Sequence, residues 1–197
     1  MNKHNAPTIN IQSSQLESMI INKEKPLDES YENMIENFDC GHKRYNAVLR
    51  RYKSLPITTA LLYLHESLEL IAYCNYCCSS LKVGKDVFPA VEIKTFSVSK
   101  KFQKNSQNDK TKYHINDLNC SDYALRYFIR RIKELTSQMH ASYIVLFSDS
   151  SNKVISFYKE NGFCSVDNKY KFLMSEGNEN REQYLCLSLV DKTQVNF

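Results

Sequence analysis

The sequence predicts an α+β fold, a mixed sheet with helices on its faces. Three observations predict it: short apolar runs typical of strands, segments whose apolar residues recur at helical spacing, and the order of the two kinds. The expected order is β, α, ββ, β, α, β, α, ββ. Strands follow one another directly in this order, which separates it from the strict alternation of a doubly wound parallel sheet.

The first half of the chain predicts one helix among strands. A strand is expected near Met19–Asn22. In residues 38–55 (FDCGHKRYNAVLRRYKSL), apolar side chains recur on one helical face, and Asp39 is suited to cap the helix start. Thr59–His65 and Leu70–Ser79 flank the polar turn ESLE, which predicts a β-hairpin of core strands.

The second half predicts two helices around a buried strand. Val91–Val98 reads as the third long strand, and residues 99–119 after it are expected to form a charged, Asn-rich loop. Apolar residues at helical spacing then predict an amphipathic helix over residues 121–140. The remaining elements are a strand at Tyr143–Phe147, a helix at about Ser151–Glu160, and a closing pair of strands at Cys164–Phe172 and Tyr184–Val190.

The composition is that of one domain. A chain of 197 residues with 42% apolar side chains can bury a core, and we expect a single domain over 18–197 behind a flexible N-terminus over 1–17. The net charge of +4 permits a phosphorylated ligand or RNA without requiring one. No window approaches the ~20 apolar residues of a membrane helix, and the N-terminus lacks the apolar region of a signal peptide. We therefore expect a cytoplasmic protein without membrane contact.

The cysteines favour buried thiols. Cys74, Cys77 and Cys78 lie in an apolar, tyrosine-rich strand, and no second Cys/His pair with ligand spacing follows them. We expect thiols in a reducing compartment rather than a metal site.

Several segments carry a family resemblance. Residues 91–98 (VEIKTFSV) open with a glutamate before an F-x-V stretch, the long helix is followed at once by YIVLF, and residues 157–163 (FYKENGF) fit the pattern F-Y-x-x-x-G-F. Together they resemble the GCN5-related N-acetyltransferases (GNAT family). Residues 38–49 also resemble the F-x-C-G-x-x-x-L-N-x-x-L helix of one subgroup, with Tyr45 in place of Leu. The resemblance covers about residues 18–190. It implies a three-layer α/β arrangement, with a mostly antiparallel central sheet and helices on both faces.

The resemblance implies two catalytic residues. Transfer of an acetyl group to an amine of pKa ~10.4 requires a proton acceptor. Glu92 matches the family's base, although a strand carboxylate that faces water or pairs with Lys94 is an equal alternative. Tyr158 matches the tyrosine that protonates the departing thiolate of coenzyme A, against the alternative of a core tyrosine.

The resemblance also implies an acetyl-CoA site. The backbone of Phe96, Ser97 and Val98 would pair with the pantetheine arm, and an amide near Val98 would hold the oxyanion. Asn152 is a marginal further contact, because its spacing to Tyr158 is one residue off the family pattern.

The phosphate loop departs from the family pattern Q/R-x-x-G-x-G/A. Gln103 fits its first position, but an insertion of about a dozen residues follows, and the chain's glycines lie elsewhere. Asn119 and Ser121 take the places of the small residues. Either the amides of Ser121, Asp122 and Tyr123 still face phosphate, helped by Lys100, Lys101 and Lys104, or the nest is lost. A third alternative is an insertion without a role.

Two functions remain open. The first is an N-acetyltransferase that transfers an acetyl group from acetyl-CoA to an amine by direct attack. Its acceptor is a small molecule, a protein amine or, less favoured, an aminoacyl-tRNA, and a homodimer is compatible with it. The second is a catalytically inactive binding or regulatory module on the same fold, which the altered phosphate loop favours.

Overall fold

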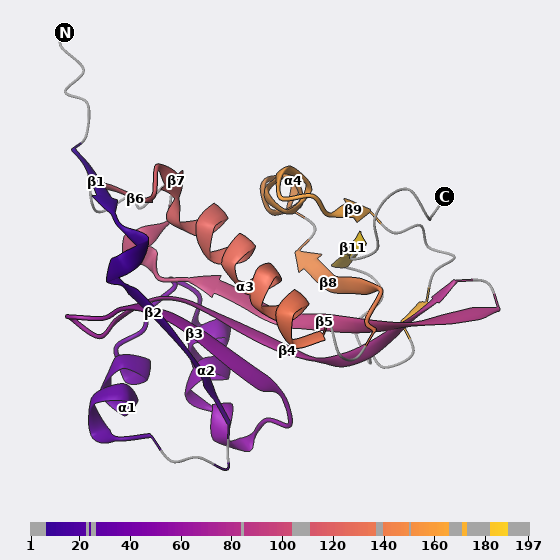
Figure 1. The fold of residues 1–197 in the computed structure, drawn as a ribbon, viewed down its shortest axis with the longest axis horizontal. Coiled ribbons are helices and arrows are strands. Elements are labelled where there is room, and N and C mark those ends of the chain that lie inside the picture. The colour runs from indigo at the N-terminus through magenta and orange to yellow at the C-terminus, as the bar shows by residue number, and fades with distance from the viewer. Residues whose placement is uncertain are drawn as a thin grey trace, which may run out of the picture. The chain divides into compact units, whose positions relative to one another are not determined.

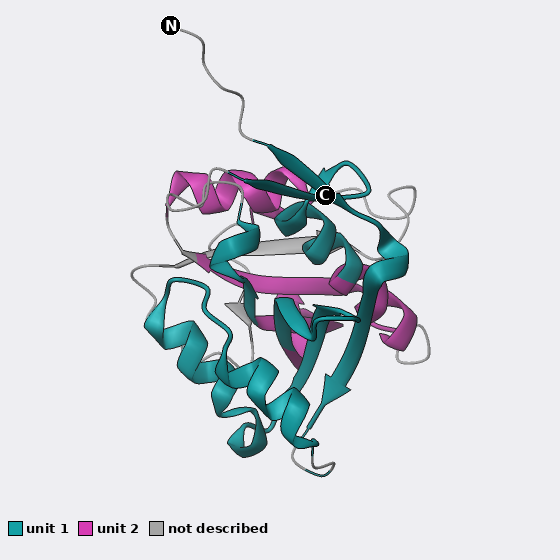
Figure 2. Ribbon diagram, turned by 90° about the vertical axis from the view of Figure 1, so that its left-hand side faces the viewer, with its two compact units in different colours: residues 1–75, 95–127 teal, residues 76–94, 128–197 magenta. Residues whose placement is uncertain are grey.

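The structure is a computed structural model (Figure 1). It describes residues 7–22, 24, 27–83, 85–103, 111–136, 140–149, 151–165, 171–172 and 182–188. The chain falls into two compact units, drawn in teal and magenta in Figure 2. Unit 1 holds residues 1–75 and 95–127, and unit 2 holds residues 76–94 and 128–197.

Unit 1 is built on antiparallel strands. Strand β2 (Leu16–Ile21) pairs with β3 (Thr58–Leu64), from Leu16↔Leu64 to Ile21↔Thr59. Next to β3 lies β4 (Glu69–Val83), whose first half belongs to this unit. The predicted hairpin is confirmed, and β4 extends beyond the predicted Leu70–Ser79 by one residue at its start and four at its end.

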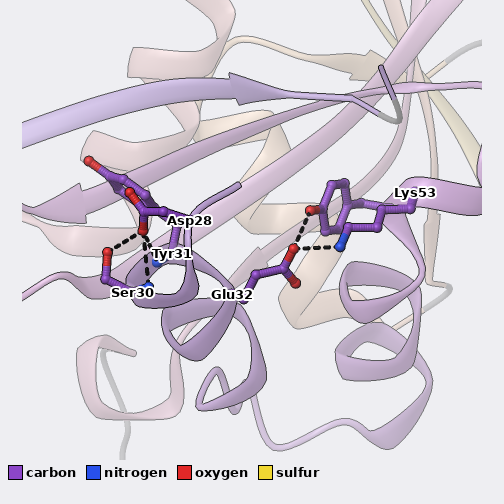
Figure 3. Close-up of polar contacts among 6 residues, drawn as sticks. Asp28, Ser30, Tyr31, Glu32 and Lys53 are labelled. Carbon is purple, nitrogen blue, oxygen red and sulfur yellow. Dashed lines mark hydrogen bonds and ion pairs between the residues drawn. The ribbon is translucent and has the colours of Figure 1, made fainter. Parts of the chain in front are cut away.

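Two helices cover one face of these strands. Helix α1 (Glu29–Glu36), which the sequence analysis missed, starts where the Asp28 carboxylate accepts the backbone N–H groups of Ser30 and Tyr31 (Figure 3). Helix α2 (Lys43–Arg50) and the short helix η2 (Tyr52–Ser54) replace the single helix predicted over 38–55. The same figure shows Glu32 of α1 pairing with Lys53 of η2. Their shared core contains Ile21, Met34, Ile35, Phe38, Cys40, Leu49, Tyr52, Leu61, Tyr63, Leu70 and Tyr73.

A third helix begins on the opposite face of unit 1. Ile21 points into the core below α1 and α2, and side chains alternate along a strand, so Ser18 points to the other face. There its hydroxyl hydrogen-bonds the hydroxyl of Tyr127 on α3 (Cys120–Thr136). Helices therefore lie on both faces of the sheet, as expected.

The N-terminal strand and the insertion fold together. Strand β1 (Thr8–Ile11), followed by η1 (Ser13–Gln15), pairs in parallel with β6 (Lys112–Ile115), and β6 pairs with β7 (Leu118–Asn119). The expectation of a flexible segment over 1–17 is therefore wrong for residues 8–17. The expectation of a loop over 99–119 is wrong for η3 (Lys100–Phe102), β6 and β7. These strands are short, and β1 and β6 pair with residues about a hundred positions away, so the sequence did not show them.

Unit 2 contains a mixed sheet. Strand β5 (Asp86–Val98), which starts in this unit, pairs in parallel with β8 (Tyr143–Asp149), and β8 pairs antiparallel with β11 (Glu182–Ser188). Strand β11 also pairs with β9 (Cys164–Ser165), and β10 (Lys171–Phe172) pairs with β4. The predicted loop between the closing strands lies outside the described residues.

Helix α4 (Asn152–Glu160) confirms its prediction. The Ser151 hydroxyl caps it by accepting the N–H of Val154, and Gly162 ends it with a φ of +93°. No helix among the described residues is long and apolar enough to cross a membrane.

Candidate active site

Glu92 is buried in the middle of β5. It is 1% exposed and lies opposite Val145 of β8. Of the alternatives to a catalytic base, the carboxylate facing water is wrong, and the carboxylate paired with Lys94 is what the structure shows. Its Oε1 atom lies 2.7 Å from Nζ of Lys94. Within the described part of the chain, its Oε2 atom has no hydrogen-bond partner. A buried carboxylate with one charged neighbour and one oxygen that accepts no hydrogen bond lowers the stability of the fold. A role in packing alone does not explain such a residue.

The pairing of β5 with β8 stops just beyond Glu92. It covers Ala90↔Tyr143 to Ile93↔Leu146. Strand β5 runs on to Val98 and β8 to Asp149, but no pairing between them is recorded in these described segments. The backbone of β5 from Lys94 onward is therefore not paired with β8. A ligand can add to a strand only where the strand edge is unpaired in this way.

Gln103 supports the end of β5 in unit 1. Its side-chain amide donates hydrogen bonds to the backbone carbonyls of Val98, at 2.8 Å, and Cys40, at 2.9 Å. The sequence analysis placed Gln103 at the start of a phosphate loop. In the structure its amide nitrogen is used to fix the Val98 carbonyl, and Ser97 and Val98 beside it are 7% and 6% exposed.

The FDCG segment forms a hydrogen-bonded turn before α2. The Asp39 carboxylate accepts the N–H of Gly41 (2.8 Å) and the amide of Asn46 (2.9 Å), and the N–H of Cys40 donates to Asn46 Oδ1. The hydrogen bond from the Gly41 N–H is the main reason why the pKa of Asp39 is lowered. Lys100 N–H donates to the Asp39 carbonyl at 2.7 Å. The hydrogen bonds of Asp39 therefore form this turn, and Asp39 does not cap the helix. The turn holds the segment that follows β5.

The start of α3 differs from the expected nest. Asn119 lies in β7, and its amide donates to Asp122 Oδ2 at 3.1 Å. Just before α3, positive φ occurs at Asn116 (+46°) and Asp117 (+67°), in the β6–β7 turn, and not at Asn119. Ser121, Asp122 and Tyr123 lie in the first turn of α3.

Tyr158 is packed by the F-Y-x-x-x-G-F segment. It is 9% exposed, and its ring makes edge contacts with Phe157 at 5.2 Å and Phe163 at 5.7 Å between centroids. Gly162 turns the chain so that the Phe163 N–H reaches the Tyr158 carbonyl at 3.1 Å. Asn152 is the first residue of α4 and is exposed.

The predicted site residues divide between the units. Glu92, Asn152 and Tyr158 belong to unit 2. Unit 1 holds Phe96, Ser97, Val98, Gln103, Asn119, Ser121, Asp122 and Tyr123. Lys104 lies outside the described residues.

Sequence reasoning missed one neighbour of Glu92. Burial raises the pKa of the half-buried Cys77 thiol, Glu92 adds to this rise, and Lys94 opposes it. Cys77 thus lies within electrostatic range of the pair. The expectation of buried thiols holds for Cys74, whereas Cys78 is exposed. Cys77 lies on β4 and Glu92 on β5, which are neighbours in the sheet, and a sequence does not show which strands are neighbours.

Comparison with known proteins gives the fold. No protein-family model matches the sequence, and no curated protein matches it either. Solved structures match over most of the chain. One is a bacterial toxin (TM-score 0.60, 17% identity, 88% of this chain and 90% of that chain). Another is a tyrosine-to-phenylalanine variant of the AtaT toxin bound to the C-terminus of the antitoxin AtaR and acetyl-CoA (0.61, 13%, 88% and 93%).

A third match is a KacTA–DNA complex (TM-score 0.59, 16% identity, 87% of this chain and 93% of that chain). The fold is that of the GCN5-related N-acetyltransferases. In this acetyltransferase fold the order of strands and helices after β5, with α3, β8 and α4, is the order that the sequence motifs predicted.

Proposed function

We propose that the protein is an N-acetyltransferase that transfers an acetyl group from acetyl-CoA to an amine. One observation carries the proposal: the β5–β8 pairing stops at Ile93, next to the buried carboxylate of Glu92. The AtaT toxin, which shares the fold, was solved with acetyl-CoA. An unpaired strand edge and a base at its start are what a direct attack on a thioester requires.

The cofactor would lie along β5. Its pantetheine arm would pair with the backbone of Phe96, Ser97 and Val98, with the Val98 carbonyl already fixed by Gln103. The diphosphate would lie at the first turn of α3, because the positive end of the helix dipole favours an anion there. Lys100, which is exposed and follows β5, adds positive charge in the same unit. The carboxylate of Asp122 in that first turn opposes the anion, so we expect moderate affinity.

The residues of unit 2 would move the protons. Glu92 accepts a proton from the amine, directly or through water, and the nitrogen then attacks the thioester carbonyl carbon. The C–S bond breaks as the tetrahedral intermediate collapses. Tyr158 gives its proton to the departing sulfur, which spares the release of a free thiolate.

The surface of α2 favours an aminoacyl-tRNA as the acceptor. Lys43, Arg44 and Arg51 are exposed and have no ion-pair partner among the described residues, and the His42 ring stacks on Tyr45 at 4.5 Å. Cations beside stacked rings suit phosphates and bases. AtaT was solved with acetyl-methionyl-tRNAfMet. The reduced thiols of the described cysteines fit a cytoplasmic location.

Ligand-dependent stability tests the cofactor. A ligand at 100 times its Kd adds about 2.7 kcal/mol to the free energy of unfolding. We expect acetyl-CoA to raise the melting temperature and the chain to acetylate an amine from a panel that includes charged tRNA. Glu92→Gln and Tyr158→Phe should lower turnover while acetyl-CoA still binds. No shift at millimolar acetyl-CoA would leave the inactive binding module as the function.

A further inference from the structure

Lys94 holds its amine against the proposed base. Its Nζ atom lies 2.7 Å from Glu92 Oε1, and the two side chains are 35% and 2% exposed. The pair of Lys101 with Glu69 has the same 2.7 Å separation, but there the carboxylate is 36% exposed. Lys94 thus combines a solvent-reachable amine with a buried carboxylate, and Lys101 does not.

Glu92 is the proton acceptor next to the Lys94 amine. Oε2 has no recorded partner in the described structure, so Lys94 is the group that compensates the carboxylate. When one proton passes from Nζ to the carboxylate, both groups become neutral. The neutral amine that remains has the lone pair that attack on a thioester needs.

Lys94 also begins the unpaired edge of β5. The last pair with β8 is Ile93↔Leu146, and Lys94 is the next residue. The proton acceptor Glu92, the amine of Lys94 and the start of the unpaired edge therefore lie within three residues of one strand.

We propose that Lys94 is an acetylation site of the protein's own reaction, modified within the same chain. This rests on the proposed function. Glu92 Oε1 takes a proton from the Lys94 ammonium, and Nζ attacks the thioester carbonyl carbon. The C–S bond breaks, the leaving sulfur takes a proton from Tyr158, and Nζ loses a second proton to solvent. The proton on Glu92 then returns to Tyr158 through solvent. Acetyl-lysine, free coenzyme A and one released proton are the products.

Acetylation would remove the charge that pairs with Glu92 and fill the space in front of the base. The modification therefore limits itself to one event per chain and lowers transfer to external amines. Cys77 is a weak competitor for the acetyl group, because its raised pKa keeps the thiol protonated and the thiolate is the nucleophile.

Peptide mass spectrometry tests the site. The full chain is incubated with acetyl-CoA, and acetylation is followed at Lys94 and at Lys101 as the internal control. We expect roughly hundredfold faster labelling at Lys94, at a rate independent of protein concentration. In urea the two sites should label alike. Equal labelling of both lysines in the folded chain would overturn the proposal, as would a rate that rises with protein concentration.

Two variants separate this inference from the proposed function. Glu92→Gln should reduce labelling of Lys94 to the Lys101 rate, and Lys94→Arg should abolish it. The wild-type chain is also tested for acetyl-CoA binding and for transfer to external amines. If it does both while Lys94 stays unmodified, the inference fails alone. If it does neither, the proposed function fails and takes the inference with it.

Discussion

The side-chain amide of Gln103 donates a 2.8 Å hydrogen bond to the Val98 carbonyl at the end of β5, and a second, at 2.9 Å, to the Cys40 carbonyl. Gln103 thereby ties the FDCG turn to the strand that we propose as the cofactor edge. The glutamine at this position acts on the strand backbone.

Removing this link should weaken cofactor binding more than chemistry. Gln103→Leu loses two donors, each with a net value of about 1 kcal/mol, so we expect the KM for acetyl-CoA to rise roughly tenfold with a smaller change in kcat. Steady-state kinetics measure the split. Gln103→Glu is the matched control, because it keeps the size but places a carboxylate against two carbonyls, and its effect should be larger. A glutamate variant with wild-type KM would contradict the role given to Gln103.

Gly41 is required for its backbone conformation rather than for space. Its φ is +81°, and a Cβ there would meet only Lys100 Cδ at an ordinary 3.9 Å. Gly41→Ala should therefore cost about 1 kcal/mol in the free energy of unfolding, from the left-handed conformation alone. Urea titration measures it. Gly41→Asn should cost less, because asparagine tolerates positive φ better; a larger cost for asparagine would mean that space limits the site.

Asp39 should make the FDCG turn sensitive to acid. Its pKa is lowered in the folded state, chiefly by the hydrogen bond from Gly41. Its contribution to stability is therefore present above the ordinary carboxyl pKa and lost as the pH falls through the lowered folded value, below about pH 4. Thermal melts between pH 7 and pH 3 should show a smaller stability loss for Asp39→Asn than for the wild type. Parallel curves would contradict the assignment.

Ser151 should contribute to stability through α4. Ser151→Ala removes the acceptor for the Val154 N–H and should cost about 1 kcal/mol, which is about 3 °C in melting temperature for a chain of this size. Ser156→Ala is the control on the same helix. Ser156 is exposed in the helix interior, where alanine has the higher helix propensity, so its melting temperature should stay or rise. Equal losses in both variants would rule out the cap.

Local signals were enough for the long elements. The apolar stripe of α3, the apolar runs of β3 and β4, and Gly162 at the end of α4 each depend on residues close in sequence, and their predictions are confirmed. Helix α1 was missed, although Asp28 is a recognisable cap, because its stripe is short. Strands β1 and β6 could not be predicted, because parallel pairing joins residues about a hundred positions apart.

The sequence by itself determined the order of the long elements and the chemical types at the candidate site, a glutamate on the central strand and a tyrosine on α4. Only the tertiary structure decided that Glu92 is buried against Lys94, that pairing with β8 ends at Ile93, and that Gln103 holds a carbonyl. The reason is physical, because helix and strand periodicity depend on residues that are neighbours in the sequence. Burial, strand register and the partner of a side chain depend on segments that meet only when the chain has folded.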